Sequence, residues 1–439
     1  MTDLLKLYND RTAPRPTGGT PTLRRLRAAA YARFKERGWP AADWEDWRYV
    51  SLGPVLERAY ADAPAELAAH GSAALERALG PLPVGHVRAV LVNGRYSARH
   101  SSAEFSCGAY LGPLTTAVEM EPRLAERFLG TEPERETNPF ASLNLAEFTD
   151  GVFLSVPPDT ALAERVELWL VTGPGGPHLS FPRILGILGA GASASVLVRH
   201  LRLGAEASLV DAACEWHLLD GARLTLAEAA GPGPAGSRIQ TTDLYLDRNA
   251  HLDLTSLKTG PALVRSETRV RFKGEGAHAD LRGLAVLAGT SESDERVLAD
   301  HAVPGCVSRQ YYKHVLADAS RAEYNSLVDV HPGSTGSDSK QLCRNLLLSR
   351  QARAAARPQL LIRNDDVACS HGAATGQLDP NEIFYLRTRG LTDAAARTLL
   401  VRGFAEEILG LMPDAVWREV FELVLRERYC ALAGEHGPA

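Results

Sequence analysis

The segment from Arg363 to Gln377 carries the residue types in this chain whose spacing could do chemistry. It reads RNDDVACSHGAATGQ and places Cys369 two residues before His371. If the segment is a strand, both side chains point to one face and lie about 7 Å apart. That separation is too wide for one small ion, but it suits two ligands of a larger cluster or two contacts with a partner. A thiolate and a neutral imidazole are donors that iron and iron–sulfur species accept.

The same residue types also fit a plain structural role, a buried cysteine and a hydrogen-bonded histidine at a corner of the fold. The remaining histidines, among them His251 and His278, have no partner at a useful spacing, so we expect core or surface roles for them. The six cysteines form no Cys-x-x-Cys pair, which disfavours a self-contained zinc or iron–sulfur site. Most of the thiols should therefore be buried and inert.

Motifs of common enzyme classes are missing from the sequence. It contains no G-x-x-x-x-G-K-[ST] phosphate loop, no G-x-S-x-G elbow and no H-E-x-x-H zinc helix. We therefore expect no enzyme activity, and a partner would have to supply any energy from ATP. The net charge of -5 argues against a nucleic-acid partner. The apolar stretch from Ile184 to Val198 is too short to span a membrane, and no secretory signal opens the chain, which predicts a cytoplasmic protein.

Several kinds of region must position the Cys369–His371 segment. Helical periodicity dominates the start and the end of the chain, whereas short runs of β-forming residues separated by Gly, Asp and Asn fill the middle. An Asn93-Gly94 pair between two apolar runs predicts a hairpin. The expected regions are an N-terminal helical domain (1–80), a mixed α/β connecting region (81–149), a β core (150–378) and a C-terminal helical domain (379–439).

A weak internal repeat in the β region predicts a solenoid. Tetrads such as Gly-Ala-Ser-Ala open successive strands, and their alanines, Ala192, Ala222, Ala250 and Ala277, are separated by 30, 28 and 27 residues. With strands and no helices, each unit would form one coil of a parallel β-helix whose core is shared with its neighbours. The alternative is an antiparallel sandwich with chance Gly-Ala turns. The expected fold is therefore mainly β, a parallel β-helix core flanked by N-terminal and C-terminal helical domains.

The C-terminal helices begin at a strong start signal. Asp379 can cap a helix whose first position is Pro380. A later helix carries Leu400, Phe404 and Ile408 on one face. We expect this apolar face to be exposed, and it fits either a partner-docking surface or packing within a helical bundle.

Five long stretches of the chain resemble the SufB/SufD family of iron–sulfur cluster assembly proteins. The tetrapeptide Cys369-Ser370-His371-Gly372 favours the SufD branch of that family, although Ala373-Ala374-Thr375-Gly376 departs from its usual Ala-Thr-Val-Gly. Shorter matches near the N-terminus extend the resemblance along nearly the whole chain. The matching stretches are NPFASLN (138–144), HAVPGCVSRQYYKHVL (301–316), SDSKQLCRNLLLS (337–349), PQLLIRNDDVACSHGAATGQLD (358–379) and EIFYLRTRGLTDAAARTLLVRGFAEEIL (382–409).

The resemblance implies a non-catalytic scaffold subunit built on a right-handed parallel β-helix. It implies pairing with a SufB-like subunit, or with a second copy, through strands near the end of the β-helix. His371, with Cys369 as a weaker candidate beside it, would meet iron or a nascent cluster at that interface, and no cofactor would be bound stably. A SufC-like ATPase would dock on the C-terminal helices, where Leu400, Phe404 and Ile408 are the candidate contacts.

A second class of function uses the same fold. Some β-helix proteins are carbohydrate-active enzymes, which need a cleft with two carboxylates held at a suitable distance. Asp365 and Asp366 are adjacent in the sequence, so on a strand they would face opposite sides. That arrangement makes a poor catalytic pair, and this reading stays the alternative.

Overall fold

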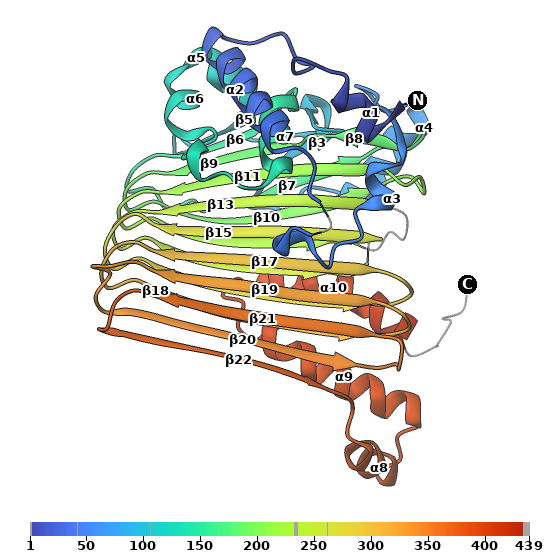
Figure 1. Cartoon of the computed structure of the whole chain (residues 1–439). Helices are drawn as coiled ribbons and strands as arrows, with labels where there is room; N and C mark the ends of the chain where they lie inside the picture. Colours follow the sequence, from blue (N-terminus) through green and yellow to red (C-terminus); the bar gives the residue numbers. More distant parts are fainter. Residues whose placement is uncertain (1, 42, 106, 232–235, 261, 433–439) are drawn as a thin grey trace.

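The computed structural model describes residues 2–432 except 42, 106, 232–235 and 261. It is mainly β, a right-handed parallel solenoid of about seven turns with helices at both ends of the chain (Figure 1). Two sheets face each other across the interior, and neighbouring strands within each sheet differ by one coil in sequence. This arrangement confirms the predicted β-helix and excludes the antiparallel sandwich.

The first sheet has ten strands in the order β22-β20-β18-β16-β14-β12-β10-β7-β3-β4. The hairpin predicted at Asn93-Gly94 is confirmed, since β3 and β4 pair antiparallel around two residues with φ of 52° and 80°. The strands of this sheet are β3 (His86–Val92), β4 (Arg95–Tyr96), β7 (Arg165–Thr172), β10 (Ser193–Arg202), β12 (Arg223–Ala230), β14 (His251–Lys258), β16 (His278–Leu287), β18 (Val307–Leu316), β20 (Ser337–Leu347) and β22 (Val367–Gly376).

The second sheet has twelve strands and ends at β21. Its long strands pair in parallel, while β1 joins β2 and β5 joins β6 antiparallel at the N-terminal end of the solenoid. The strands of this sheet are β1 (Thr2–Asp3), β2 (Ala59–Asp62), β5 (Tyr110–Pro113), β6 (Val152–Val156), β8 (His178–Ser180), β9 (Arg183–Leu188), β11 (Leu209–Leu218), β13 (Ser237–Leu246), β15 (Leu263–Phe272), β17 (Glu292–His301), β19 (Arg321–Val330) and β21 (Arg353–Ile362).

The repeated Gly-Ala tetrads form the turns along one edge of the solenoid. Gly191, Gly221, Asn249 and Gly276 occupy the same place in successive coils, and each has a positive φ that a larger side chain rarely adopts. The backbone N–H of each donates to a carbonyl of the next coil, for example Gly221 to Arg248 at 2.7 Å. The alanine that follows each of these residues is fully buried, so the tetrad turns the chain and fills the corner of the core.

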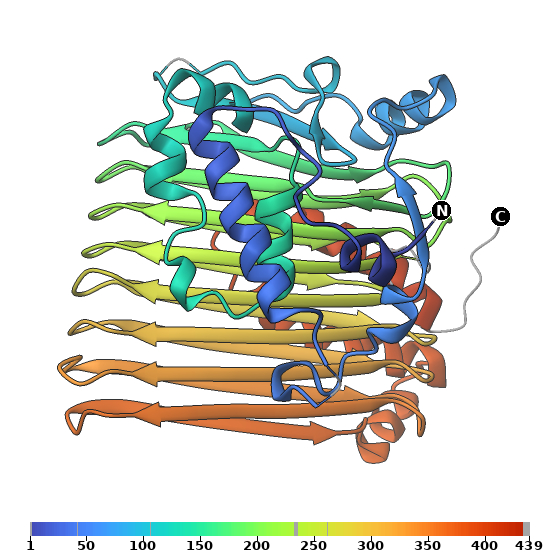
Figure 2. The same ribbon diagram turned by 45° about the horizontal axis from the view of Figure 1, so that its top comes forward.

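Helices cover the outer faces of both sheets. Figure 2 shows α2 and α7 lying across the twelve-stranded sheet, and Figure 1 shows α9 and α10 behind the ten-stranded sheet. None of the helices within the described residues is long and apolar enough to cross a membrane. The helices are α1 (Leu4–Asn9), α2 (Pro21–Arg37), α3 (Gly53–Leu56), α4 (Ala69–Leu79), α5 (Leu114–Met120), α6 (Arg123–Phe128), α7 (Pro139–Glu147), α8 (Pro380–Thr388), α9 (Asp393–Leu409) and α10 (Ala415–Leu432), with short 3-10 turns at Glu45–Trp47, Ala98–His100 and Pro133–Arg135.

Candidate functional site at the open end of the solenoid

The last coil leaves the solenoid open at its C-terminal end. Both β21 and β22 are terminal strands of their sheets, each hydrogen-bonded to the preceding coil on one side only. A terminal strand presents a row of backbone N–H and C=O groups to whatever lies beyond it. Leu361 and Ile362 of β21 are 44% and 43% exposed there. The open end therefore combines hydrogen-bonding edges with apolar side chains, which is the surface a second chain could extend.

His371 and Cys369 lie on β22, as the sequence predicted for a strand. In register with the preceding coil, Cys369 pairs with Ser339 and His371 with Gln341. Cys369 is half-buried and packs against the main hydrophobic core, whereas His371 is exposed. Both side chains point to the interior face of the strand, where the thiol is partly covered and the imidazole is exposed at the open end.

The orientation of the His371 ring is fixed by a hydrogen bond across the open end. Its Nδ1 lies 2.9 Å from the carbonyl oxygen of Pro358 on β21. Because a carbonyl can only accept, Nδ1 must carry the proton, and in the neutral imidazole the lone pair then resides on Nε2. A histidine whose second nitrogen is held in this way is the usual form of a metal ligand.

The Cys369 thiol does not readily form the thiolate that would bind a metal. Burial raises its pKa above the ordinary value of 9.0, although a hydrogen bond from the Ser339 backbone opposes the shift. The thiol is therefore protonated at neutral pH until a metal or a nearby cation favours the thiolate. Of the other cysteines, Cys214, Cys306 and Cys343 are buried and Cys107 is half-buried, whereas the side chain of Cys430 lies outside the described residues.

A polar network lies in the interior directly beneath His371. Gln341 donates to Ser326 at 2.7 Å, and both Ser326 and Tyr324 donate to the side-chain oxygen of Gln310. All four side chains are buried within the last coils. These three hydrogen bonds link β18, β19 and β20 beneath the open end, while Nε2 of Gln310 and Oε1 of Gln341 have no hydrogen-bond partner among the described residues.

One chain supplies too few ligands for an iron centre here. Among the described residues, His371 belongs to no group of three or more His, Cys, Asp or Glu side chains whose ligand atoms lie within 4.8 Å of one another. An iron ion or an iron–sulfur cluster usually takes four or more ligands. Any such site at the open end must therefore be completed by groups outside this chain.

The C-terminal helices differ from the sequence prediction in one respect. Ile408 is fully buried and Phe404 and Leu400 are half-buried, so the expectation of an exposed face is wrong at Ile408. The buried Lys313 on β18 donates to the Phe404 carbonyl at 2.7 Å and lies 4.0 Å from the centre of the Phe404 ring. This face holds α9 on the ten-stranded sheet, because the apolar outer residues of that sheet need a cover.

The exposed apolar side chains of the C-terminal region lie elsewhere. A groove of about 590 Å³ runs between α9 and α10, and Leu423 on its border is 64% exposed. A second groove of about 550 Å³ lies between α8 and the end of β20, and Phe384 in its lining is 68% exposed. Sequence periodicity could not find these residues, since they fall outside the regular apolar stripe.

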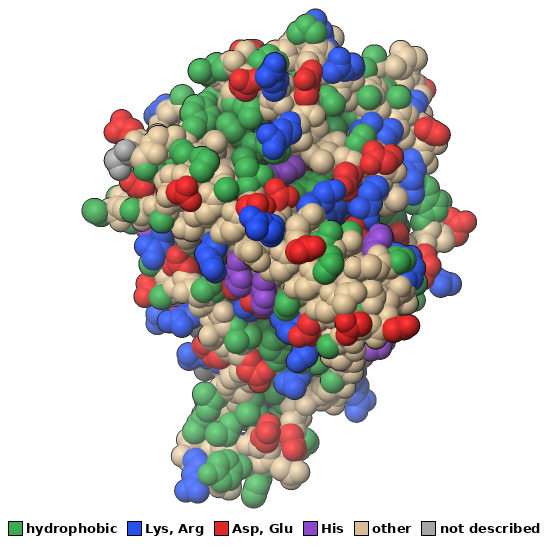
Figure 3. All heavy atoms as spheres, turned by 90° about the vertical axis from the view of Figure 1, so that its left-hand side faces the viewer, with side chains coloured by type: hydrophobic (Ala, Val, Ile, Leu, Met, Phe, Trp, Pro, Cys, Tyr) green, Lys and Arg blue, Asp and Glu red, His purple; other side chains and the backbone are tan. Residues whose placement is uncertain are grey.

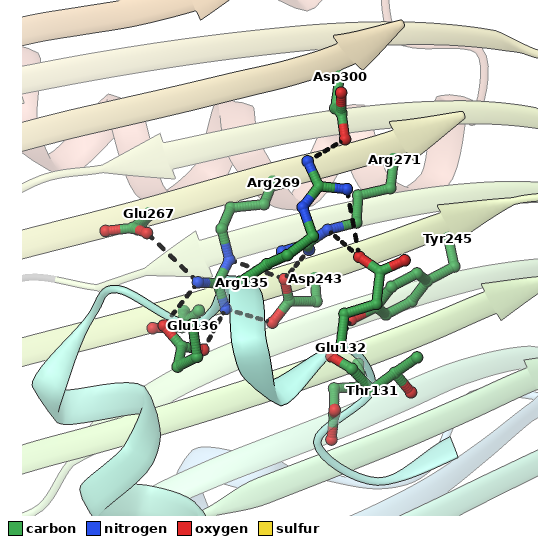
Figure 4. Close-up of polar contacts among 12 residues, drawn as sticks. Thr131, Glu132, Arg135, Glu136, Asp243, Tyr245, Glu267, Arg269, Arg271 and Asp300 are labelled. Carbon is green, nitrogen blue, oxygen red and sulfur yellow. Dashed lines mark hydrogen bonds and ion pairs between the residues drawn. The ribbon is translucent and has the colours of Figure 1, made fainter. Parts of the chain in front are cut away.

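Charged residues on the twelve-stranded sheet form ion pairs that hold the segment before α7 on the sheet. Figure 4 shows Glu132 and Glu136 pointing from the segment before α7 toward Arg269 and Arg271 on β15. Arg269 contacts Glu136 at 2.8 Å and Asp243 at 2.6 Å. Burial alone would raise the pKa of Asp243, but Arg269 and Arg271 lower it below its ordinary value. Asp243 therefore stays ionised and paired, which makes it a poor proton donor for glycoside cleavage.

A carboxyl pair does exist on the same sheet, beneath the N-terminal segment. Asp294 and Glu323 occupy the same register of β17 and β19, and burial together with Asp294 raises the pKa of Glu323 to about 8. Both residues are less than a tenth exposed. Nearby, Arg357 is paired with Glu45 of the N-terminal segment at 2.9 Å. A pair so deeply covered does not form a carbohydrate cleft.

Comparison with known proteins agrees with this architecture. The chain matches the family model of the SUF system FeS cluster assembly SufBD core domain over residues 170–404, and that of the SufBD protein N-terminal region over residues 1–168. The chain therefore belongs to the SufBD family of iron–sulfur cluster assembly proteins.

Individual relatives point the same way. The chain is 27% identical over 389 residues to the iron–sulfur cluster assembly protein SufD of Escherichia coli, covering 86% of each protein. It is 32% identical over 300 residues to a SufBD family protein of Mycobacterium bovis, covering 66% of this chain and 72% of the relative. A SufBD family protein of Synechocystis is 26% identical over 389 residues, covering 84% and 83%.

Proposed function

We propose that this chain is a SufD-type, non-catalytic scaffold subunit of a cytoplasmic SUF complex. Its open end pairs with a SufB-like subunit, or with a second copy, and His371 contributes a ligand to iron or a nascent cluster at that junction. The observation that carries this proposal is the His371 imidazole, held by the Pro358 carbonyl on an exposed terminal strand so that Nε2 can bind a metal.

The incomplete ligand set supports a shared site. His371 and Cys369 can supply two donors at most, and the remaining donors have to come from the partner and from sulfide. A site that is complete only in the assembled complex holds iron transiently and gives up its cargo when the chains separate. No stably bound cofactor is needed in this chain alone.

The terminal strands support the pairing. Both β21 and β22 are ten residues long, so a partner strand can add to either sheet through main-chain hydrogen bonds. An exposed terminal strand of this length is a liability unless something covers it. A second solenoid joined end to end would continue both sheets and bury Leu361 and Ile362.

The C-terminal helices support docking of a SufC-like ATPase. Their exposed Phe384 and Leu423 border two grooves, and α9 is tied to the solenoid through Lys313, whose ammonium contacts Glu407 at 2.7 Å. Because α8 begins directly after β22, movement of these helices is transmitted to the strand that carries His371. ATP hydrolysis in the partner could thereby open the junction.

The experiment is complementation of a strain that lacks its own SufD, with iron–sulfur enzyme activity as the readout. We expect His371→Ala to abolish maturation and Cys369→Ser to reduce it less, while His70→Ala, which removes an exposed histidine on α4, has no effect. Amide hydrogen exchange of residues 353–376 should slow when the SufB-like partner is added. Full activity of His371→Ala would overturn the metal role, and unchanged exchange would overturn the pairing.

A further inference from the structure

Two histidines from different coils stack on the outer face of the ten-stranded sheet. His251 on β14 and His278 on β16 occupy the same register of neighbouring parallel strands. Their rings lie 4.7 Å apart between centroids and only 14° from parallel. The sequence expectation that neither histidine has a partner is therefore wrong, because one coil of the solenoid brings residues 27 positions apart side by side.

A carboxylate completes the group. Asp280 lies two residues after His278 on the same strand, so both side chains point to the same face. Its Oδ2 is 3.1 Å from Nε2 of His278. One ligand atom from each of the three residues lies within 4.8 Å of the others. The three donors thus surround one point in space.

The group is open to solvent. The side chains of His278 and Asp280 are 31% and 23% exposed, and His251 is also half-buried. Figure 3 looks at the turn edge of the solenoid and shows histidine side chains at the surface among acidic and basic ones. An ion can reach the three donors while water fills its remaining coordination positions.

We propose that His251, His278 and Asp280 form a binding site for a divalent first-row transition ion. Two imidazoles, which are borderline donors, and one carboxylate, a hard donor, together suit Fe²⁺, Co²⁺ and Zn²⁺ and leave the rest of the coordination sphere free. Bonds of about 2.0–2.2 Å require the three donor atoms to approach one another by rotation of the exposed side chains. The rigid sheet fixes the spacing of the three Cα positions.

Neighbouring charges set the strength of this site. Arg282 lies 3.5 Å from Asp280, but its shorter contact, at 2.7 Å, is with Asp253 on the adjacent strand. Arg223, on the neighbouring strand β12, is the register partner of His251. The positive charges of Arg223 and Arg282 repel a bound cation, and the ion pair with Asp253 offsets the charge of Arg282. The site therefore binds reversibly and exchanges its ion, unlike a closed structural zinc centre.

The site is separate from the open end. Strands β18 and β20 lie between β16 and β22 in the sheet. A second group, formed by Asp300, Asp329 and His331, carries no such proposal, because Arg135 already pairs with Asp300 and Arg363 with Asp329. The carboxylate of the site formed by His251, His278 and Asp280 is less neutralised, since Arg282 lies 3.5 Å from Asp280 whereas Arg135 and Arg363 lie 2.5 Å from Asp300 and Asp329.

The test is anaerobic titration of the tag-free full-length protein with Co²⁺, followed by its d–d absorption and by competition with Fe²⁺ and Zn²⁺. We expect one equivalent to bind and the His251→Ala/His278→Ala double variant to lose it. Asp280→Asn removes the negative charge from the ligand set and should weaken binding about tenfold. His371→Ala and His331→Ala are the matched controls, and both should bind as the wild type does.

A variant that gains affinity guards against loss of folding as an explanation. Arg282→Gln removes a positive charge beside Asp280, so it should tighten Co²⁺ binding. Absence of Co²⁺ binding in the wild type would overturn the proposal, as would unchanged binding in the double histidine variant. Loss of binding in His371→Ala would reassign the ion to the open end and would equally overturn it.

Discussion

An ion pair inside the solenoid gives a stability prediction that depends directly on the fold. Lys258 on β14 faces Glu295 on β17 across the interior, and the two side chains are 3% and 4% exposed. Lys258→Met leaves the Glu295 carboxylate buried without its partner. Removing one member of a buried pair costs about 3–5 kcal/mol, so we expect the free energy of unfolding to fall by about that amount.

The double variant separates the pair from its surroundings. Replacing both charges by apolar groups of similar size is often neutral or stabilising, so Lys258→Met/Glu295→Leu should unfold within about 1 kcal/mol of the wild type. The assay is urea-induced unfolding followed by tryptophan fluorescence and circular dichroism. Arg248→Met is the matched control, since its pair with Asp220 also joins adjacent coils but is 65% and 50% exposed, and should cost less than about 1 kcal/mol.

The outcome that would refute this reasoning is equal destabilisation in Lys258→Met and in the double variant. The two charges would then not depend on each other, and the interior would be wetter than the burial of its side chains indicates. A loss in Arg248→Met as large as that in Lys258→Met would also contradict it, because exposure would then make no difference to the cost of breaking a pair.

Two further predictions concern the protonation of Glu323 and the packing of the core at Gly283. The raised pKa of Glu323, about 8 against an ordinary 4.5, means that the folded state keeps a proton which the unfolded state releases, so stability falls as pH rises from about 4.5 to 8. Glu323→Gln should raise the urea midpoint at pH 9 more than at pH 5, and an equal change at both would contradict the shift. Gly283→Ala would place a Cβ 2.2 Å from the Tyr312 ring and should cost about 1–3 kcal/mol, whereas Gly376→Ala meets nothing within 4 Å and should be neutral; equal midpoints in thermal melts would refute this.

The repeat in the sequence was enough to predict the solenoid. A positive-φ turn residue followed by a buried alanine is a local requirement of every coil, so it leaves a periodic trace at Ala192, Ala222 and Ala250. The hairpin at Asn93-Gly94 and the cap at Asp379 were predictable for the same reason, since a turn and a helix start depend on a few adjacent residues.

Side-chain contacts between coils were much harder to predict. The stacking of His251 on His278 depends on the length of one coil, and the aligned tetrads that contain these two residues were the signal that could have found it. The burial of Ile408 depends on where α9 lies against the sheet, which helical periodicity alone does not specify. For His371, sequence spacing and family resemblance gave the residue, but the Pro358 carbonyl that sets its tautomer comes from the opposite strand.

The central proposal is that the imidazole of His371 supplies a metal ligand where two chains meet. The direct measurement is the content of iron and acid-labile sulfide in the complex purified anaerobically with its partners. We expect the His371→Ala complex to assemble with the same subunits and elute at the same size, yet to carry iron only at background level. An intact His371→Ala complex with as much iron and sulfide as the wild type would contradict it.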